Sequence, residues 1–178
     1  MPTIGVALAI PAPHGDFLQA KREEFGDPLA RDIPPHVTLL PPTEVDAEDV
    51  PAFEEHLAVV AAGAAPFRVV LRGTGTFRPV SPVVFVQVSQ GIAGCEQLEQ
   101  AVRSGPVTRD LDFPYHPHVT VAHHLDDAAL DHAFDDLAQV EIAFDATELH
   151  LYEHGDDGVW RPGVSFPFGP GAGPAATH

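Results

Sequence analysis

The chain has little cysteine, little positive charge and no long apolar stretch. Cys95 is the single cysteine in 178 residues, which excludes an internal disulfide and fits a reducing compartment. No apolar run approaches the roughly 20 residues that cross a bilayer. The segment Met1–Ile10 also lacks the basic region that begins a signal peptide. We therefore expect a cytoplasmic protein without a membrane partner.

Positive charge is scarce, since 9 Lys and Arg residues stand against 26 Asp and Glu residues, and the formal net charge is −17. A field of this sign repels long nucleic acids, whose binding depends on many contacts between basic side chains and phosphates. Any phosphate must therefore be held locally, by a few arginines, hydroxyls and backbone amides. The composition favours a small or terminal anionic substrate and makes long nucleic acid an unexpected partner.

What the chain does contain is an internal repeat. The tetrapeptide Pro-His-Val-Thr occurs at Pro35–Thr38 and again at Pro117–Thr120, nearly half a chain length later, and an apolar pair follows each copy. Chance recurrence is possible in a chain rich in proline and valine. Two copies in matching contexts nevertheless indicate a duplicated architecture.

The repeated tetrapeptide has the alternation of a strand. Side chains alternate between the two faces of a strand, so His36 and Thr38 point one way while Val37 points the other. The same parity puts His118 and Thr120 together. Each strand thus offers an imidazole and a hydroxyl to a cleft and anchors itself in a core. If the two halves face each other, the two pairs form an acid/base site.

The spacing of apolar and turn residues in the rest of the chain predicts an α+β fold with two similar lobes and mostly antiparallel sheets backed by helices. We expect a single bilobal domain over residues 1–168 and a disordered Gly/Pro/Ala-rich tail over residues 169–178. The expected helices span residues 13–25, 46–64, about 95–105 and about 130–137. The expected strands are 3–10, the two His-Thr strands, 67–74, 83–89, 148–153 and 159–166, and the first His-Thr strand should end at Pro41-Pro42.

The motifs PHVTL and PHVTV resemble the two signature motifs of the two-histidine phosphoesterase superfamily. That superfamily includes bacterial RNA 2′,3′-cyclic phosphodiesterases, which are often called 2′-5′ RNA ligases. The resemblance covers roughly residues 1 to 168 and implies a bilobal fold around a central groove. It also implies metal-independent, cofactor-free chemistry on cyclic or diester phosphates. The two motif histidines would be the acid and the base, and the two motif threonines would contact the phosphate.

The chain departs from the cyclic phosphodiesterase branch in two places. Many members of that branch have an arginine after the second motif, where this chain has His123 followed by His124. The first motif runs into Pro41-Pro42 in place of the Phe-Leu-Gly common there. The resemblance therefore predicts the type of reaction better than it predicts the identity of the substrate. The phosphate could belong to a mononucleotide, an RNA end or an ADP-ribose derivative, and ligase activity and oligomeric state stay open.

The motif residues support this chemistry without the family name. Opening a cyclic phosphate needs a base that activates water and an acid that protonates the leaving ribose oxygen. Histidine, with an ordinary pKa near 6.5, performs either task at neutral pH. Two threonine hydroxyls can donate hydrogen bonds to the non-bridging oxygens as charge builds up. Which histidine is the acid does not follow from the sequence.

Five further residues are weaker candidates for substrate binding. Arg78 could grip a phosphate while Phe77 or Phe85 stacks on a base. The alternative is that Phe85 belongs to the strand core and Arg78 is a solvated turn residue. Tyr115 and His116 precede the second motif, and His116 shares the parity of His118. His116 would then line the groove or be a partly exposed residue at the strand end.

Two other classes of function compete with a two-histidine phosphoesterase. His116, His118, His123 and His124 could suggest a metallohydrolase, because imidazole is a common metal ligand. No His-Glu-x-x-His or Cys-x-x-Cys pattern accompanies them, and the first motif would be left unexplained. The same fold could also serve as a non-catalytic nucleotide-binding module. We predict catalysis over binding alone, because His and Thr are intact in both motifs, and we predict it without a metal, because no metal-binding pattern is present.

Overall fold

The computed structural model describes residues 1–170 and 175–176 and contains two antiparallel sheets, each with a Pro-His-Val-Thr strand at its edge. The five-stranded sheet has the order β2 (His36–Glu44), β1 (Thr3–Ala9), β7 (Glu148–His154), β8 (Trp160–Pro167) and β9 (Ala175–Ala176). The four-stranded sheet has the order β5 (His118–His123), β4 (Val83–Gln90), β3 (Phe67–Thr76) and β6 (Glu141–Ala146). The predicted mixture of helices with antiparallel sheets is confirmed.

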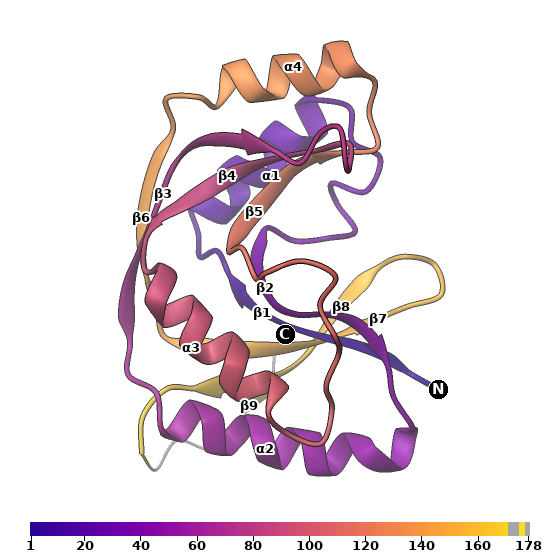
Figure 1. Cartoon of the computed structure of the whole chain (residues 1–178), viewed down its shortest axis with the longest axis vertical. Helices are drawn as coiled ribbons and strands as arrows, with labels where there is room; N and C mark the ends of the chain where they lie inside the picture. Colours follow the sequence, from indigo (N-terminus) through magenta and orange to yellow (C-terminus); the bar gives the residue numbers. More distant parts are fainter. Residues whose placement is uncertain (171–174, 177–178) are drawn as a thin grey trace.

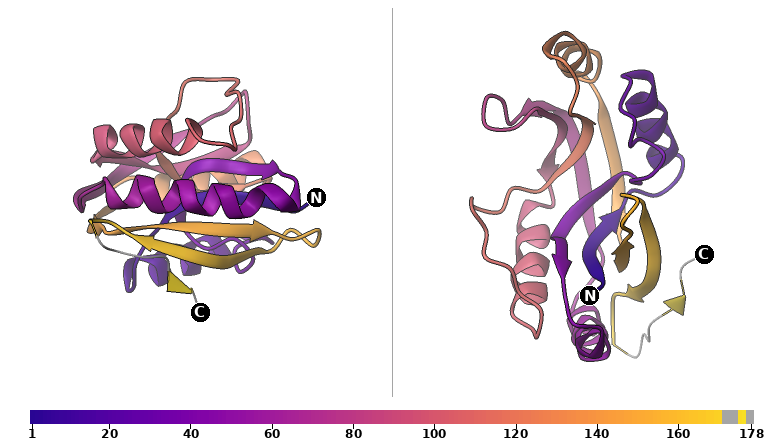
Figure 2. Two further views of the ribbon diagram at one scale, coloured as in Figure 1. Left: turned by 90° about the horizontal axis from the view of Figure 1, so that it is seen from below. Right: turned by 90° about the vertical axis from the view of Figure 1, so that its right-hand side faces the viewer.

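The helices repeat in the same order in both halves of the chain. They are α1 (His14–Glu24), α2 (Val50–Ala62), α3 (Ile92–Arg103) and α4 (Asp127–Asp136). The order β1-α1-β2-α2 in the first half recurs as β4-α3-β5-α4 in the second. Helices α1 and α4 lie at one end of the molecule and α2 and α3 at the other (Figures 1 and 2). The duplicated, two-lobed fold that the repeated motif predicts is therefore confirmed.

The two halves are interlocked by their first helices. Helix α3 of the second half packs against β2 of the first, and α1 of the first half packs against β5 of the second. The edge strands β2 and β5 also contact each other. Each motif strand therefore depends on a helix from the other half, and the two motifs meet where the lobes join.

The strands that carry the motifs show the predicted alternation. Val37 and Val119 are fully buried, and Val121 is fully buried two residues further along β5. His36 and His118, on the opposite faces of their strands, are only partly buried. The apolar side chains of both motifs join one large core that runs through both lobes. Burial of the valines thus fixes the direction in which the histidines point.

The first motif strand does not end at Pro41-Pro42, as the sequence predicted. Strand β2 continues through both prolines to Glu44. It is an edge strand with β1 as its one partner, and the register between them shifts where Ile4 faces Thr43 and Val6 faces Leu40. Proline lacks a backbone N–H, which an edge strand with a bulge tolerates.

Two other expectations about secondary structure need correction. Residues 46–64 do not form one helix, because Ala47–Asp49 make a short 3₁₀ turn and α2 begins at Val50 with a proline in its first turn. Strand β6 was not predicted, although Ile142, Phe144 and Ala146 alternate as buried residues along it.

The expected disordered tail falls partly outside the described residues. Residues 171–174 and 177–178 lie outside them, while the intervening β9 pairs with β8. Within the described part of the chain, no helix is long and apolar enough to cross a membrane.

Candidate active site

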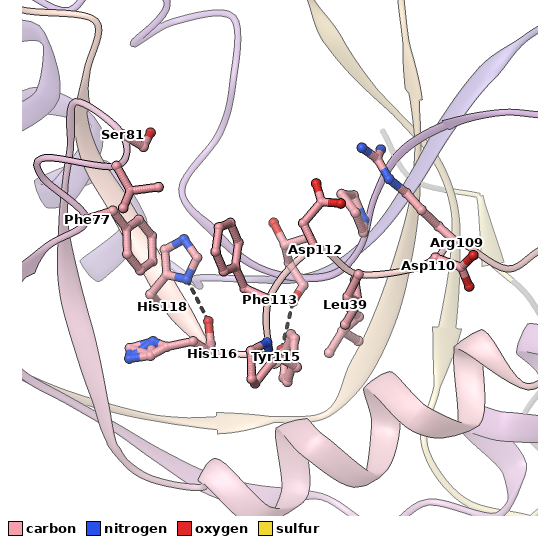
Figure 3. A pocket seen from close by; sticks show the side chains of 15 residues that line it. Leu39, Phe77, Ser81, Arg109, Asp110, Asp112, Phe113, Tyr115, His116 and His118 are labelled. Atoms are coloured by element: carbon pink, nitrogen blue, oxygen red, sulfur yellow. Dashed lines mark hydrogen bonds between the residues drawn. The ribbon is translucent and has the colours of Figure 1, made fainter.

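A groove of about 660 Å³ opens beside the junction of β2 and β5. Thr38 and Leu39 of β2 and His118 of β5 line it, together with the β3–β4 turn and the segment that joins α3 to β5 (Figure 3). The lining residues are Thr38, Leu39, Pro41, Phe77, Val80, Ser81, Arg109, Asp110, Leu111, Asp112, Phe113, Pro114, Tyr115, His116 and His118. The groove is therefore built from both halves of the chain.

The two motif histidines are held in the same way. The Nδ1 of His36 lies 2.6 Å from the carbonyl oxygen of Pro34, and the Nδ1 of His118 lies 2.7 Å from that of His116. A carbonyl oxygen only accepts hydrogen bonds, so in both rings Nδ1 must carry the proton. Each neutral imidazole then has its lone pair on Nε2. The duplication thus extends to the tautomer of both rings.

The surroundings of His36 favour its neutral form. Its Nε2 lies 3.1 Å from the Thr38 hydroxyl, which donates to it, and its ring packs against Trp160 at 4.5 Å between centroids, tilted by 33°. Burial lowers the pKa of His36 to about 4, and the positive charges of Arg22 and protonated His118 act in the same direction. His36 does not itself line the groove, but its Nε2 is bonded to Thr38, which does. It is therefore suited to accept a proton.

His118 has aromatic neighbours in place of a charged one. Its ring lies 4.9 Å from Phe77, nearly perpendicular to it, and 5.1 Å from Phe85. Burial lowers the pKa of His118, and protonated His116 lowers it further, while the bond to the His116 carbonyl opposes both. Its centroid lies 5.9 Å from that of His116. In the free protein, both motif histidines are therefore neutral near pH 7.

Behind the two motifs lies a buried ion pair that the sequence did not reveal. Arg22 and Asp27 are 4% and 5% exposed, and the Arg22 Nε donates to an Asp27 oxygen at 2.7 Å. The same oxygen accepts from the backbone N–H of His123 at the end of β5. Arg22 is also close enough to His36 to lower its pKa. One ion pair thus connects helix α1, the second motif strand and the first motif histidine.

Of the three aromatic and basic residues proposed for the β3–β4 region, Phe77 lines the groove. Phe85 is 4% exposed and packs at 4.5 Å on Phe77, so it lies beneath the surface, as the strand-core interpretation expected. Arg78 does not line the groove, because its guanidinium bonds Asp131 at 2.9 Å and pairs with Asp127 on α4.

Of the two candidate residues before the second motif, Tyr115 supports the first motif and His116 lines the groove. The Tyr115 hydroxyl donates to the backbone carbonyl of Thr38 at 2.7 Å, so Tyr115 ties the segment before β5 to the first motif. Burial raises the pKa of Tyr115, which keeps its hydroxyl a donor. His116 is exposed and lines the groove beside His118. Thr120 is partly buried on β5 opposite Phe85, on the same strand face as His118.

The segment that joins α3 to β5 adds residues that sequence reasoning missed. Arg109, Asp112 and Phe113 all line the groove (Figure 3). Arg109 is exposed, and its guanidinium donates to the carbonyl oxygen of Pro42. The one sequence signal for it was the scarcity of basic residues. Nothing in the local pattern of this segment indicates that it folds beside β2.

The four histidines of the metallohydrolase hypothesis form two separate pairs. His116 and His118 lie together in the groove, whereas the rings of His123 and His124 stack on each other at 3.6 Å at the other end of β5. Over residues 1–170 and 175–176, no three His, Cys, Asp or Glu side chains are grouped so that they could hold a metal ion. The geometry gives the His-cluster hypothesis no ligand set.

Comparison with known proteins gives one consistent result. The family model described as the 2′-5′ RNA ligase superfamily matches residues 10–158. A protein of Halalkalibacterium halodurans assigned as a phosphoesterase is 29% identical over 170 residues, which cover 93% of this chain and 96% of the relative. A similarly assigned protein of Geobacillus kaustophilus is 26% identical over 158 residues, covering 88% and 90%.

Solved structures agree on the fold. TT0787 of Thermus thermophilus superposes with a TM-score of 0.68 at 22% identity, covering 95% of this chain and 99% of the other. E. coli LigT in complex with 3′-AMP gives a TM-score of 0.63 at 22% identity, covering 94% and 98%. At such identities the similarity shows a common two-lobed architecture.

Proposed function

Because the chain belongs to the 2′-5′ RNA ligase superfamily of two-histidine phosphoesterases, we propose that it hydrolyses a 2′,3′-cyclic phosphate, or a related 2′-5′ phosphodiester, without a metal ion. The observation that carries the proposal is the matched pair of histidines. Both have Nδ1 tied to the carbonyl two residues earlier, so both have the lone pair on Nε2, which in His36 accepts from the Thr38 hydroxyl. General acid and base groups of this kind contribute about 10²- to 10⁴-fold each.

In this mechanism His36 is the base. Its Nε2 removes a proton from a water molecule, whose oxygen attacks the phosphorus. Burial and the charge of Arg22 lower the pKa of His36, so its lone pair is available at neutral pH. The Thr38 hydroxyl, which donates to Nε2 in the free protein, can turn to a non-bridging phosphate oxygen when water takes its place.

His118 is the acid. As the attacking water forms its bond to phosphorus, one P–O bond to the ribose breaks, and protonated Nε2 of His118 donates to the leaving oxygen. In the free protein burial lowers the pKa of His118. A bound phosphate anion raises that pKa again, because it stabilises the imidazolium. The two histidines exchange these tasks in the reverse reaction, in which the ribose oxygen re-forms its bond to phosphorus and water leaves.

The substrate of this reaction is a small nucleotide or the terminal cyclic phosphate of an RNA. With a net charge of −17, the protein repels long polyanions at a distance. A groove of about 660 Å³ has the size of a pocket for a small ligand. The related fold of E. coli LigT has been crystallised with 3′-AMP and with ATP, which supports a nucleotide ligand.

The test is an assay of purified protein with adenosine 2′,3′-cyclic phosphate, followed by ³¹P NMR, with and without EDTA. We expect conversion of the cyclic phosphate to one monoester at the same rate in both samples. The double variant His36→Ala/His118→Ala serves as the control for contaminating activity. Turnover that EDTA abolishes would favour a metallohydrolase. Nucleotide binding by calorimetry without turnover of any cyclic phosphate or 2′-5′ diester would favour the non-catalytic binding module.

A further inference from the structure

The segment of residues 104–117 between α3 and β5 forms one wall of the groove and is anchored at three points. Val107 is buried at 5% exposure, Arg109 donates to the Pro42 carbonyl, and the Tyr115 hydroxyl donates to the Thr38 carbonyl at 2.7 Å. The last two bonds end on β2, the strand of the first motif. The wall is therefore attached to the other half of the site.

This wall holds an aromatic ring out into the groove. Phe113 is 67% exposed, although the segment on both sides of it is anchored. Across the groove lies Phe77, and the His118 imidazole is between the two in the view of Figure 3. Val80, at 73% exposure, adds a second apolar side chain to the same groove. Large apolar groups exposed together in a concave site are typical of ligand contacts.

The residue next to Phe113 supplies an unpaired acceptor. The Asp112 carboxylate lies beside the Phe113 ring in Figure 3 and forms no hydrogen bond or ion pair with any of the described residues. An ionised carboxylate only accepts hydrogen bonds. A ligand that stacks on Phe113 would therefore meet a group that prefers donors, not carbonyl oxygens or phosphates.

We propose that a nucleobase stacks on the exposed ring of Phe113 and that Asp112 accepts a hydrogen bond from its exocyclic amino group. The inference rests on the proposed function, and it narrows the substrate to a nucleoside cyclic phosphate whose base carries an amino group. Stacking of a base on aromatic side chains is tolerant of base identity. The carboxylate discriminates, since cytosine offers an N–H donor at the position where uracil presents a carbonyl oxygen.

The stacking is tested with Phe113→Ala. We expect KM for cytidine 2′,3′-cyclic phosphate to rise about five- to a hundredfold with little change in kcat. Phe113→Trp should keep KM within a few-fold of wild type. The base-free substrate glycerol 1,2-cyclic phosphate should be hydrolysed equally well by all three proteins. The matched control is Phe17→Ala, which removes a ring that is 43% exposed on α1, away from the groove lining.

The base preference is tested by comparing cytidine with uridine 2′,3′-cyclic phosphate. We expect the wild type to favour cytidine about tenfold in kcat/KM, and Asp112→Asn to remove most of that preference. Asp156→Asn is the matched control, because it removes the same charge from an exposed residue between β7 and β8 that does not line the groove. Equal use of both substrates by wild type, or equal effects of the two Asp variants, would overturn the assignment.

Failure of the subsite and failure of the chemistry can be told apart by calorimetry with the product analogue cytidine 3′-phosphate, which needs no turnover. Weaker binding to Phe113→Ala supports the subsite even if no cyclic phosphate is hydrolysed. Unchanged binding, together with normal hydrolysis of cytidine and glycerol cyclic phosphates by Phe113→Ala, would overturn the subsite and leave the phosphoesterase proposal intact.

Discussion

The two copies of the repeated motif have identical tethers and different neighbours. Both histidines use Nδ1 to hold a carbonyl oxygen two residues earlier in the chain. His36 packs against Trp160 and lies near the buried Arg22, whereas His118 is surrounded by Phe77, Phe85 and His116. Local sequence sets the tether, and the rest of the fold sets the charge around each ring.

This difference supplies a chemical reason for unequal roles. A permanent positive charge near His36 disfavours its protonation, and no arginine acts on His118 in the same way. Duplication would thus have produced two equivalent imidazoles, which the neighbouring helices and strands made unequal. The predictions below test that inequality.

The largest effect is expected from removing the imidazoles. His36→Ala and His118→Ala should each lower kcat at least about a hundredfold. The pH profiles of kcat should separate them: His36→Ala should lose the acidic limb, where the base becomes protonated, and His118→Ala the basic limb, where the acid loses its proton. Profiles from pH 3.5 to 9 with a cyclic nucleotide provide the measurement, because the His36 pKa of about 4 puts the acidic limb at the low end of this range. Loss of the opposite limbs would reverse the roles, and full activity in either variant would point to another group, with His116 the first suspect.

The next largest effect is expected from breaking the Arg22–Asp27 ion pair, which lies near the first motif histidine, His36, and not near the second. Arg22→Met leaves the Asp27 carboxylate buried without its cation, which typically costs about 3–5 kcal/mol of unfolding free energy. Urea denaturation at pH 7 measures it. The matched control is Arg161→Met, because the Arg161–Asp157 pair is more than half exposed and should contribute little to the unfolding free energy. Equal effects of the two variants would contradict the buried position of Arg22.

The lowered pKa of His36 predicts a dependence of stability on pH. The folded ring binds its proton near pH 4, and the unfolded ring near 6.5. As the pH falls from 6.5 towards 4, the unfolded chain takes up this proton first, so the unfolding free energy decreases over that window. Urea midpoints at pH 7 and pH 5 should differ less in His36→Gln than in wild type. An unchanged difference would mean that His36 titrates normally in the folded protein.

The smallest effect is expected from the two hydroxyls. Thr38 donates to His36 Nε2 and lines the groove, whereas Thr120 does not line it in this ligand-free structure. Thr38→Val should therefore lower kcat/KM about tenfold, since one hydrogen bond to a charged phosphate is lost, and Thr120→Val should lower it less. Steady-state kinetics on both variants decides this. A larger loss in Thr120→Val would mean that the second threonine carries the phosphate.

Much of the fold followed from local pattern. The alternation of His36 with Val37 and of His118 with Val119 predicted which side chains would be buried, because a strand has a fixed period of two. The same rule failed at Pro41-Pro42, since tolerance of proline depends on whether the strand lies at a sheet edge. That position is a property of the whole sheet.

The features of the candidate site likewise divide into those that the sequence determined and those that only the tertiary structure decided. The sequence by itself determined the repeated His-Thr pairs, the duplicated order of helices and strands, and a charge that disfavours long polyanions. Only the tertiary structure brought Arg22 close to His36 and Phe113 into the groove with His118, and turned Arg78 towards α4. Periodicity and motif spacing are carried by neighbouring residues. Contacts between distant segments depend instead on how the two sheets and their exchanged helices pack, which no local pattern encodes.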